Sequence, residues 1–219
     1  SVVRYMPGLV LMQPDAAQPD RPAPFVDLPK LFSVYQESAR WNRILGCENA
    51  ADLNDMVSGH GLREFIRVNE ALQERKIEEI ADRFIGSGAR LLLIAGPSSS
   101  GKTTFAHRLS IALRAQGLRP VKLSLDDYYR NRDELPVEAD GRIDLERIET
   151  LDTPLISDHL NRLLAGETVQ MPEYDFNTGM RLDRTHDFSV EKGQPIIIEG
   201  IHGLNERLTE GIPREMKFK

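Results

Sequence analysis

A run of glycine, serine and lysine residues at Gly96–Thr103 has the composition and spacing of a phosphate-binding loop. It reads GPSSSGKT and fits the Walker A, or P-loop, pattern G-x-x-x-x-G-K-[ST] at every fixed position. In such a loop the backbone N–H groups bind phosphate oxygens, the lysine neutralises phosphate charge, and the threonine hydroxyl binds Mg²⁺. A chance Gly/Ser turn is the alternative, but the apolar run before the loop and the helical run after it favour a phosphate site. The residues predicted to bind a nucleotide are Gly96, Pro97, Ser98, Ser99, Ser100, Gly101, Lys102, Thr103 and Thr104, and Thr103 is also a predicted metal ligand.

Three carboxylates follow apolar runs that have the length of buried strands. Asp126 and Asp127 come directly after VKLSL, and Glu199 ends PIIIE. Because open α/β sheets bind ligands at the carboxyl edge of their strands, we expect these side chains near the loop. Asp126 could accept the proton of an attacking hydroxyl, and Glu199 could hold Mg²⁺ or its water. An acidic surface turn, or a charged residue leaving the core, would explain the same residues without a function. His202 is a weaker candidate, since a lone loop histidine is more often structural.

The segment MPEYDFNTGMR combines two aromatic residues, Tyr174 and Phe176, with Asp175 and Arg181. Stacking on these rings together with polar contacts would suit a nucleobase or a sugar. Two aromatic residues at strand spacing could equally pack a hairpin. The segment alone leaves both interpretations open.

Alternating strands and helices are predicted to position these residues. From Arg90 onward, LLLIA, VKLSL and PIIIEG are predicted strands, and GKTTFAHRLSIALRAQG is a predicted helix. Continuous apolar strands alternating with helices indicate an α/β fold, with a parallel sheet flanked by helices. Earlier in the chain, LFSVYQESARWNRIL and FIRVNEALQERKIEEIADRFIG have helical spacing, whereas the prolines of residues 1–30 indicate short extended pieces. We place a domain boundary near residue 88.

Length, charge and cysteine content restrict the class of protein. The 219 residues suffice for one large α/β domain, or for one domain with an appendage. The net charge of −6 argues against broad binding of nucleic acid. No apolar run approaches the ~20 residues of a membrane helix. The single cysteine, Cys47, excludes an internal disulfide framework and is typical of a reducing cytosol, so we expect a cytoplasmic protein.

Taken together, five segments resemble the phosphoribulokinase/uridine kinase family of P-loop kinases in their order and intervals: GPSSSGKTTF, LDDYY, DLERIETLD, PEYDFNTGMR and IIIEGIHGLN. This resemblance covers about residues 90–219. The segments YMPGLVLMQPD, ARWNRILG and VNEALQERKIEEIAD resemble the long bacterial form, in which a threonyl-tRNA-synthetase-like region precedes the kinase. The resemblance implies three parts: the end of that region (1–35), a helical linker (36–88) and a P-loop kinase core (89–219).

The resemblance also implies roles for the residues near the phosphates. Lys102 and Thr103 would serve ATP and Mg²⁺, and Lys102 would take part in catalysis. Asp126 matches the catalytic aspartate of the family, ahead of Asp127. Glu199 matches the acidic residue near the metal.

Four further residues are predicted to bind the acceptor. Tyr129 and Tyr174 match aromatic residues that line the acceptor site in the family, and Arg181 is predicted to contact the same substrate. Glu146 falls where uridine kinases have an aspartate that holds the ribose hydroxyls. One departure concerns Gly179, where uridine kinases carry a histidine near the base, so we expect loose discrimination among bases.

The resemblance predicts an ATP-dependent kinase that phosphorylates a hydroxyl of a small molecule, in first place the 5′-hydroxyl of a nucleoside. A kinase for another small hydroxylated metabolite, as in the phosphoribulokinase and pantothenate kinase branches, is one alternative. A non-catalytic ATP-binding regulator is the other. We expect neither a membrane nor a nucleic-acid partner, and a homo-oligomer stays open. Because both ends of the chain have the character of cuts, we expect the family's arginine-rich lid to be missing and turnover to be slow or absent.

Overall fold

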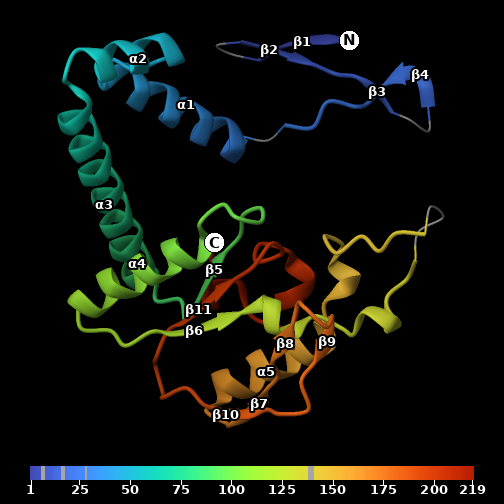
Figure 1. Cartoon of the computed structure of the whole chain (residues 1–219). Coiled ribbons are helices and arrows are strands. Elements are labelled where there is room, and N and C mark those ends of the chain that lie inside the picture. Colours follow the sequence, from blue (N-terminus) through green and yellow to red (C-terminus); the bar gives the residue numbers. More distant parts are fainter. Residues whose placement is uncertain (6–7, 16–17, 28, 138–140) are drawn as a thin grey trace. The chain divides into compact units, whose positions relative to one another are not determined.

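The computed structural model describes residues 1–5, 8–15, 18–27, 29–137 and 141–219. Residues 6–7, inside the segment YMPGLVLMQPD, lie outside these ranges. The chain divides into two compact units, Ser1–Glu70 and Ala71–Lys219 (Figure 1). Among the helices of the described ranges, none is long and apolar enough to cross a membrane.

The first unit combines short antiparallel strands with helices. The extended pieces predicted from the prolines are present as two strand pairs, β1 with β2 and β3 with β4. Helix α2 starts with a capping box, in which Asn49 accepts from the N–H of Asp52 and the Asp52 side chain accepts from the N–H of Asn49. The elements are β1 (Val2–Tyr5), β2 (Gly8–Leu11), β3 (Pro14–Asp15), β4 (Gln18–Pro22), α1 (Pro29–Ile44), α2 (Ala50–Ser58) and the first part of α3 (Leu62–Ser87).

A four-stranded parallel sheet forms the centre of the second unit, in the strand order β12-β5-β11-β6. The register aligns Ile94, Glu199 and Ser124 at the carboxyl ends of three adjacent strands. The predicted α/β fold with a parallel sheet is therefore confirmed, and the segments that follow these strands meet at one edge. The strands are β5 (Leu91–Ile94), β6 (Val121–Ser124), β11 (Ile196–Glu199) and β12 (Lys217–Phe218).

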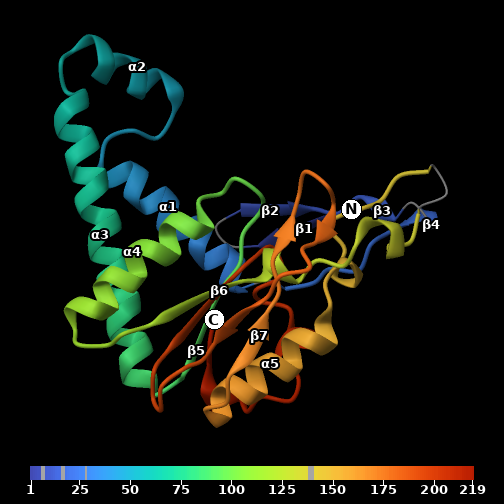
Figure 2. The same cartoon turned by 60° about the horizontal axis from the view of Figure 1, so that its bottom comes forward.

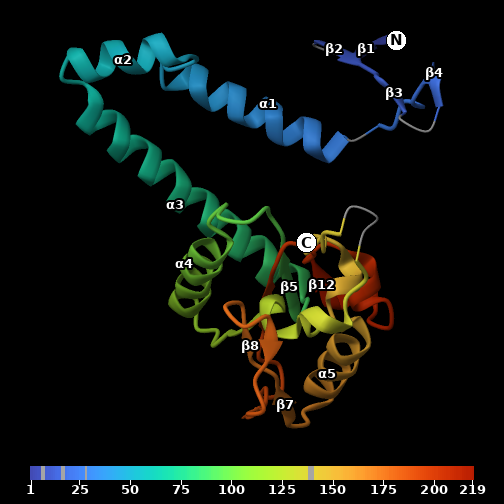
Figure 3. The ribbon, with the colours of Figure 1, turned by 45° about the vertical axis from the view of Figure 1, so that its right-hand side comes forward.

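Helices cover both faces of this sheet, with α4 (Lys102–Ala115) and α5 (Thr153–Ala165) on opposite sides (Figure 3). The α4 side packs against Leu92 and Ile197, and the α5 side packs against Leu91 and Ile196. Successive strand residues therefore face opposite cores, which explains why β5 is apolar throughout and β11 is apolar up to Ile198.

The second half of α3 belongs to the core of the second unit. Ile77, Ala81 and Phe84 are buried in the same cluster as Leu92. The amphipathic spacing of the helix turns these three side chains to the sheet, and the division into compact units falls inside α3. The functional division into 1–35, 36–88 and 89–219 stays a prediction.

Two small antiparallel ladders lie beside the sheet. Strand β7 (Val169–Met171) pairs with β10 (His186–Phe188) and runs alongside α5 (Figure 2). Strand β8 (Tyr174–Asp175) pairs with β9 (Met180–Arg181), and β8 contacts the turn after β6. The 3₁₀ helices are η1 (Leu125–Tyr128), η2 (Arg132–Glu134), η3 (Ile148–Thr150), η4 (Glu206–Thr209) and η5 (Arg214–Met216).

Candidate active site

The predicted phosphate loop joins β5 to α4, which is the context that the motif requires. Gly101 precedes α4 with a φ of 86°, in the left-handed region that glycine adopts without strain. A Cβ atom on Gly96 would meet Ser100 Oγ at 2.7 Å and Lys102 Cγ at 3.3 Å, so a side chain there would displace the side chains of the loop. Gly101 occupies the N-cap position and, as a glycine, has no side chain that could cap α4. The first N–H groups of α4 are thus available to an anion.

The Lys102 side chain and the backbone of Ser99 have conformations that suit a bound phosphate. Lys102 Nζ donates to the Pro97 carbonyl oxygen at 2.9 Å, so the ammonium group folds back over the loop. A phosphate oxygen is a stronger partner for this group than a neutral carbonyl. Ser99 has a φ of 58°, which is uncommon for serine and is a form of strain that clusters at ligand sites.

The Glu199 carboxylate connects the loop to the neighbouring strand. Its Oε1 accepts from Thr103 Oγ1 at 3.2 Å and from Ser124 Oγ at 3.1 Å. Glu199 is only 7% exposed, so these hydroxyl donors replace water around its charge. Hydroxyl and carboxylate oxygens are ligands that Mg²⁺ prefers, and Mg²⁺ takes few protein ligands beside phosphate oxygens. Thr103 and Glu199 therefore fit the metal that the sequence predicts.

Asp126 lies in η1, directly after β6, and is half-buried. Burial raises the pKa of its carboxyl group, and the charge of Glu199 raises it further, while Lys102 lowers it. A carboxylate with a raised pKa is a better proton acceptor near neutral pH.

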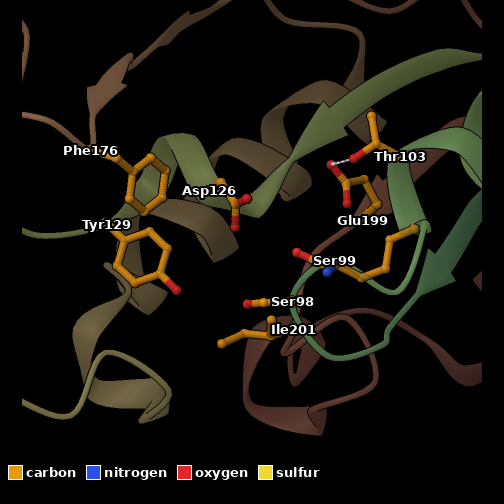
Figure 4. Close-up of a pocket in the computed structure, with 9 residues that line it drawn as sticks. Ser98, Ser99, Thr103, Asp126, Tyr129, Phe176, Glu199 and Ile201 are labelled. Carbon is orange, nitrogen blue, oxygen red and sulfur yellow. Dashed lines mark hydrogen bonds between the residues drawn. The ribbon is translucent and has the colours of Figure 1, made fainter.

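One cavity of about 280 Å³ joins the phosphate loop to Asp126. Figure 4 shows Asp126 between the rings of Tyr129 and Phe176 on one side and the Thr103–Glu199 pair on the other. The lining residues are Ser98, Ser99, Lys102, Thr103, Asp126, Tyr129, Phe176, Glu199 and Ile201. The predicted phosphate site and the predicted proton acceptor thus face the same space.

The adjacent Asp127 has a different environment. Burial raises the pKa of its carboxyl group, and a hydrogen bond from the backbone of Tyr174 opposes this shift. Of the two aspartates, only Asp126 lines the cavity. The geometry therefore favours Asp126 over Asp127 as the proton acceptor, as the resemblance implies.

Three aromatic rings pack beside Asp126. The ring centroids of Tyr129 lie 5.5 Å from Tyr174 and 5.4 Å from Phe176, and those of Tyr174 and Phe176 lie 4.9 Å apart. Burial and the charge of Asp126 raise the pKa of Tyr129 to about 12. Tyr129 and Phe176 line the cavity, and Tyr174 supports both rings from β8. The packing of the rings around the hairpin is therefore observed, and stacking on an acceptor stays a prediction.

Glu146 lies at a second cavity, of about 220 Å³, together with Gly96, Pro97, Ile201 and His202. Ile201 also lines the cavity of Asp126, so the two cavities adjoin at this side chain. Glu146 is exposed, and His202 Nε2 is buried without a hydrogen-bond partner in the described structure. Glu146 and His202, both named from the sequence, therefore line a cavity next to the phosphate loop.

Gly179 lies in the turn between β8 and β9 with a φ of 73°. A Cβ atom at this position would overlap the side chain of Arg132. Arg132 Nη2 also donates to the Phe176 carbonyl oxygen at 3.1 Å. The space beside residue 179 is thus filled by the aliphatic part of an arginine.

Arg181, a predicted acceptor contact, makes its hydrogen bonds within the protein. Its Nε donates to the Tyr129 carbonyl oxygen at 2.9 Å, and its Nη2 donates to the Tyr128 carbonyl oxygen at 3.0 Å. Its Nη1 donates to Asp152 Oδ2 at 3.1 Å. The guanidinium group therefore contacts the backbone at the end of η1.

Sequence reasoning did not name Ser124 or Ile201, and it did not include Phe176 among the acceptor contacts. Ser124 Oγ accepts from the N–H of Asp126 at 3.3 Å while donating to Glu199, so it connects two of the predicted residues. A hydroxyl residue at the last strand position before the aspartates was the signal that could have identified it.

Comparisons with known proteins agree with this architecture. The model of the phosphoribulokinase/uridine kinase family matches residues 91–212, more than half of the chain. The chain is similar to the uridine kinase of Lactobacillus helveticus (strain DPC 4571), with 36% identity over 108 residues, 49% of this chain and 50% of that protein. It is also similar to the uridine kinase of Deinococcus deserti, with 34% identity over 118 residues, 53% of this chain and 55% of that protein. The chain spans about half the length of the curated relatives it matches.

A solved structure gives the same result at the level of the fold. It is the structure of a possible uridine kinase from Bacillus stearothermophilus, with 25% sequence identity and a TM-score of 0.53. The similarity covers 64% of this chain and 77% of the other. Because the matched family region contains the phosphate loop, Asp126, the β8–β9 hairpin and Glu199, the chain belongs to the phosphoribulokinase/uridine kinase family.

Proposed function

We propose that the protein transfers the γ-phosphoryl group of ATP to a hydroxyl group of a small acceptor, in first place the 5′-hydroxyl of a nucleoside. The observation that carries this proposal is the one cavity shared by the phosphate loop and Asp126. Positioning and charge neutralisation supply most of the catalysis of phosphoryl transfer, so both groups must reach the same reacting atoms. The uridine kinase relatives support a nucleoside as the acceptor.

In this proposal, Asp126 accepts the proton of the acceptor hydroxyl while the hydroxyl oxygen attacks the γ-phosphorus and the bond to ADP breaks. Lys102 exchanges the Pro97 carbonyl oxygen for phosphate oxygens and neutralises their charge. Thr103 and Glu199 would hold Mg²⁺, which supplies further positive charge to the phosphates when bound. The rings of Tyr129 and Phe176 offer a stacking surface to the acceptor.

Two alternatives remain part of the proposal. The acceptor could be another small hydroxylated metabolite, because Gly179 has no side chain that could contact a nucleobase. The chain could also bind ATP as a regulator without an acceptor. A carboxylate in the cavity with a raised pKa favours an enzyme, because a regulator needs no proton acceptor there.

The finer assignments outside the cavity belong to the same proposal. Residues 1–35 would be the end of a threonyl-tRNA-synthetase-like region, and 36–88 would link it to the kinase core. We further propose a cytoplasmic protein whose partner is the small acceptor.

The test is acceptor-dependent ADP release, measured with ATP, Mg²⁺ and a panel of nucleosides, ribulose 5-phosphate and pantothenate. Each nucleoside is paired with its 5′-deoxy analogue, which keeps the base and ring but lacks the attacking hydroxyl. We expect slow ADP release with nucleosides and none above background with the analogues. We also expect pyrimidine and purine nucleosides to differ by about tenfold or less in kcat/KM, because Gly179 offers no polar contact to a base. ATP binding without release for any acceptor would contradict the kinase and support the regulator.

A further inference from the structure

We propose that Arg181 is a positioning residue that holds the turn carrying Asp126, rather than a contact to the acceptor. This inference rests on the proposed function and deepens it. Three atoms of the guanidinium group donate to three different acceptors: the carbonyl oxygens of Tyr128 and Tyr129, and the Asp152 carboxylate. The planar fork of arginine suits this task, because its N–H groups point in fixed directions.

The arginine connects three elements that are distant in the sequence. Arg181 is in β9, Tyr128 ends η1, and Asp152 is the N-cap of α5, where it accepts from the N–H of Leu155 at 3.2 Å. The N–H of Asp152 also donates to the Tyr128 carbonyl oxygen at 2.9 Å. The end of η1 is therefore fixed against both the hairpin and α5.

The side chain of Tyr128 gives the turn a second anchor in the core. Tyr128 is fully buried, and its hydroxyl lies 2.9 Å from His159 Nδ1 and 3.1 Å from Met171 Sδ. The Tyr128 ring anchors η1 in the core, whereas Arg181 orients the carbonyl groups of Tyr128 and Tyr129. Asp126 is two residues before Tyr128, so a rotation of these peptide groups would move its carboxylate.

The charges and burial around Arg181 agree with an internal contact. The side chains of Arg181 and Asp152 are each 25% exposed, and the backbone N–H of Arg181 donates to Asn131 Oδ1 at 2.8 Å. Phosphoryl transfer depends on near-attack geometry, and a misplacement of ~1 Å can cost ~10²-fold in rate. Losing this contact should therefore lower kcat and leave the binding of both substrates nearly intact.

The test compares Arg181→Met with Arg184→Met. Arg184 is a matched control, since it lies three residues after Arg181 and its side chain, paired with Glu173, is 72% exposed. Asp152→Asn is a second variant that removes the charge partner of Arg181 while asparagine still caps α5. Steady-state kinetics with the best nucleoside give kcat and KM, calorimetry gives ATP affinity, and hydrogen exchange of the backbone amides follows residues 125–131.

We expect Arg181→Met to lower kcat by ~10²-fold, with the acceptor KM and the ATP affinity changed by about threefold or less. In Arg181→Met the backbone amides of 125–131 should exchange at least tenfold faster, while those of β5 should not change. Asp152→Asn should also lower kcat and speed up exchange at 125–131. Arg184→Met should match the native chain in both measurements. A raised acceptor KM with unchanged kcat, or unchanged exchange at 125–131, would overturn the proposal. If the native chain phosphorylates no acceptor, the proposed function fails, and hydrogen exchange alone still decides whether Arg181 holds the turn.

Discussion

At the scale of single residues, the surroundings of Asp126 disfavour its charged form. Burial and the nearby Glu199 both disfavour the carboxylate, and Lys102 only partly offsets them. An acid whose pKa is raised by folding binds its proton more tightly in the folded chain, so the free energy of unfolding falls as pH rises from the unfolded to the folded pKa.

The first prediction follows from that sign. Asp126→Asn should raise the thermal stability of the chain near neutral pH, because the uncharged amide removes the cost. The gain should shrink as the pH is lowered below the pKa of the unfolded aspartate, where native Asp126 is also neutral. Thermal unfolding of both proteins across this pH range is the measurement. A variant that is less stable than the native chain near neutral pH would show that the charge of Asp126 stabilises the fold.

The second prediction concerns Lys102. Hydrogen bonds to charged groups contribute about 1.5–3 kcal/mol, so Lys102→Ala should weaken ATP binding by roughly 10- to 100-fold. The fold should be retained, because the observed hydrogen bond of Nζ goes to a loop carbonyl. Lys122→Ala, at an exposed position of β6, is the control and should bind ATP normally. Calorimetry that gives equal affinities for both variants would refute the phosphate site.

At the scale of elements, the second half of α3 and its first half have different roles. Phe84 is 1% exposed and packs in the core under the sheet, whereas Val68, nearer the start of the helix, is 39% exposed. Both residues belong to the same amphipathic helix, and the packing separates them.

The third prediction uses this difference. Phe84→Ala should lower the free energy of unfolding by about 3–5 kcal/mol, because it leaves a cavity in the core. Val68→Ala should change it by about 0.5 kcal/mol or less. Urea denaturation of the two variants is the measurement. Equal losses would mean that residues 71–87 do not form part of the core of the second unit.

The elements also show which parts of the site local patterns can predict. Gly96–Thr103, Asp126 and Glu199 follow from motif spacing and from the rule that parallel strands end at one edge. The contacts of Arg181 do not follow from any local pattern, because its partner Asp152 and its two carbonyl acceptors belong to other elements. The same reason applies to Glu146, whose place at the neighbouring cavity depends on the loop that contains Ile201 and His202.

At the scale of the whole molecule, the chain consists of a small unit with short strand pairs and a larger unit with the sheet and the candidate site. The predicted α/β class was correct because the central strands β5 and β11 are continuous apolar runs, as a sheet covered on both faces requires. The division into compact units falls inside the long helix α3, where the sequence pattern shows no break, and the boundary near residue 88 stays a prediction.

The fourth prediction follows from this division. Residues 71–219 alone should fold cooperatively and bind ATP with an affinity within about threefold of the full chain, because the phosphate loop and its supports all lie in this part. Circular dichroism during heating tests folding, and calorimetry tests binding. A fragment that melts without a transition would show that the first unit is required for the sheet to form.

The central claim is that Asp126 takes the proton of an acceptor hydroxyl beside a bound ATP. The most direct test measures acceptor-dependent ADP release and ATP affinity for the native chain, Asp126→Asn and Asp127→Asn, all from the same preparations. We predict that Asp126→Asn loses ~10²–10⁴-fold in rate with unchanged ATP affinity, since an amide cannot accept the proton, while Asp127→Asn remains active. Full activity of Asp126→Asn, with or without loss of activity in Asp127→Asn, would contradict the account.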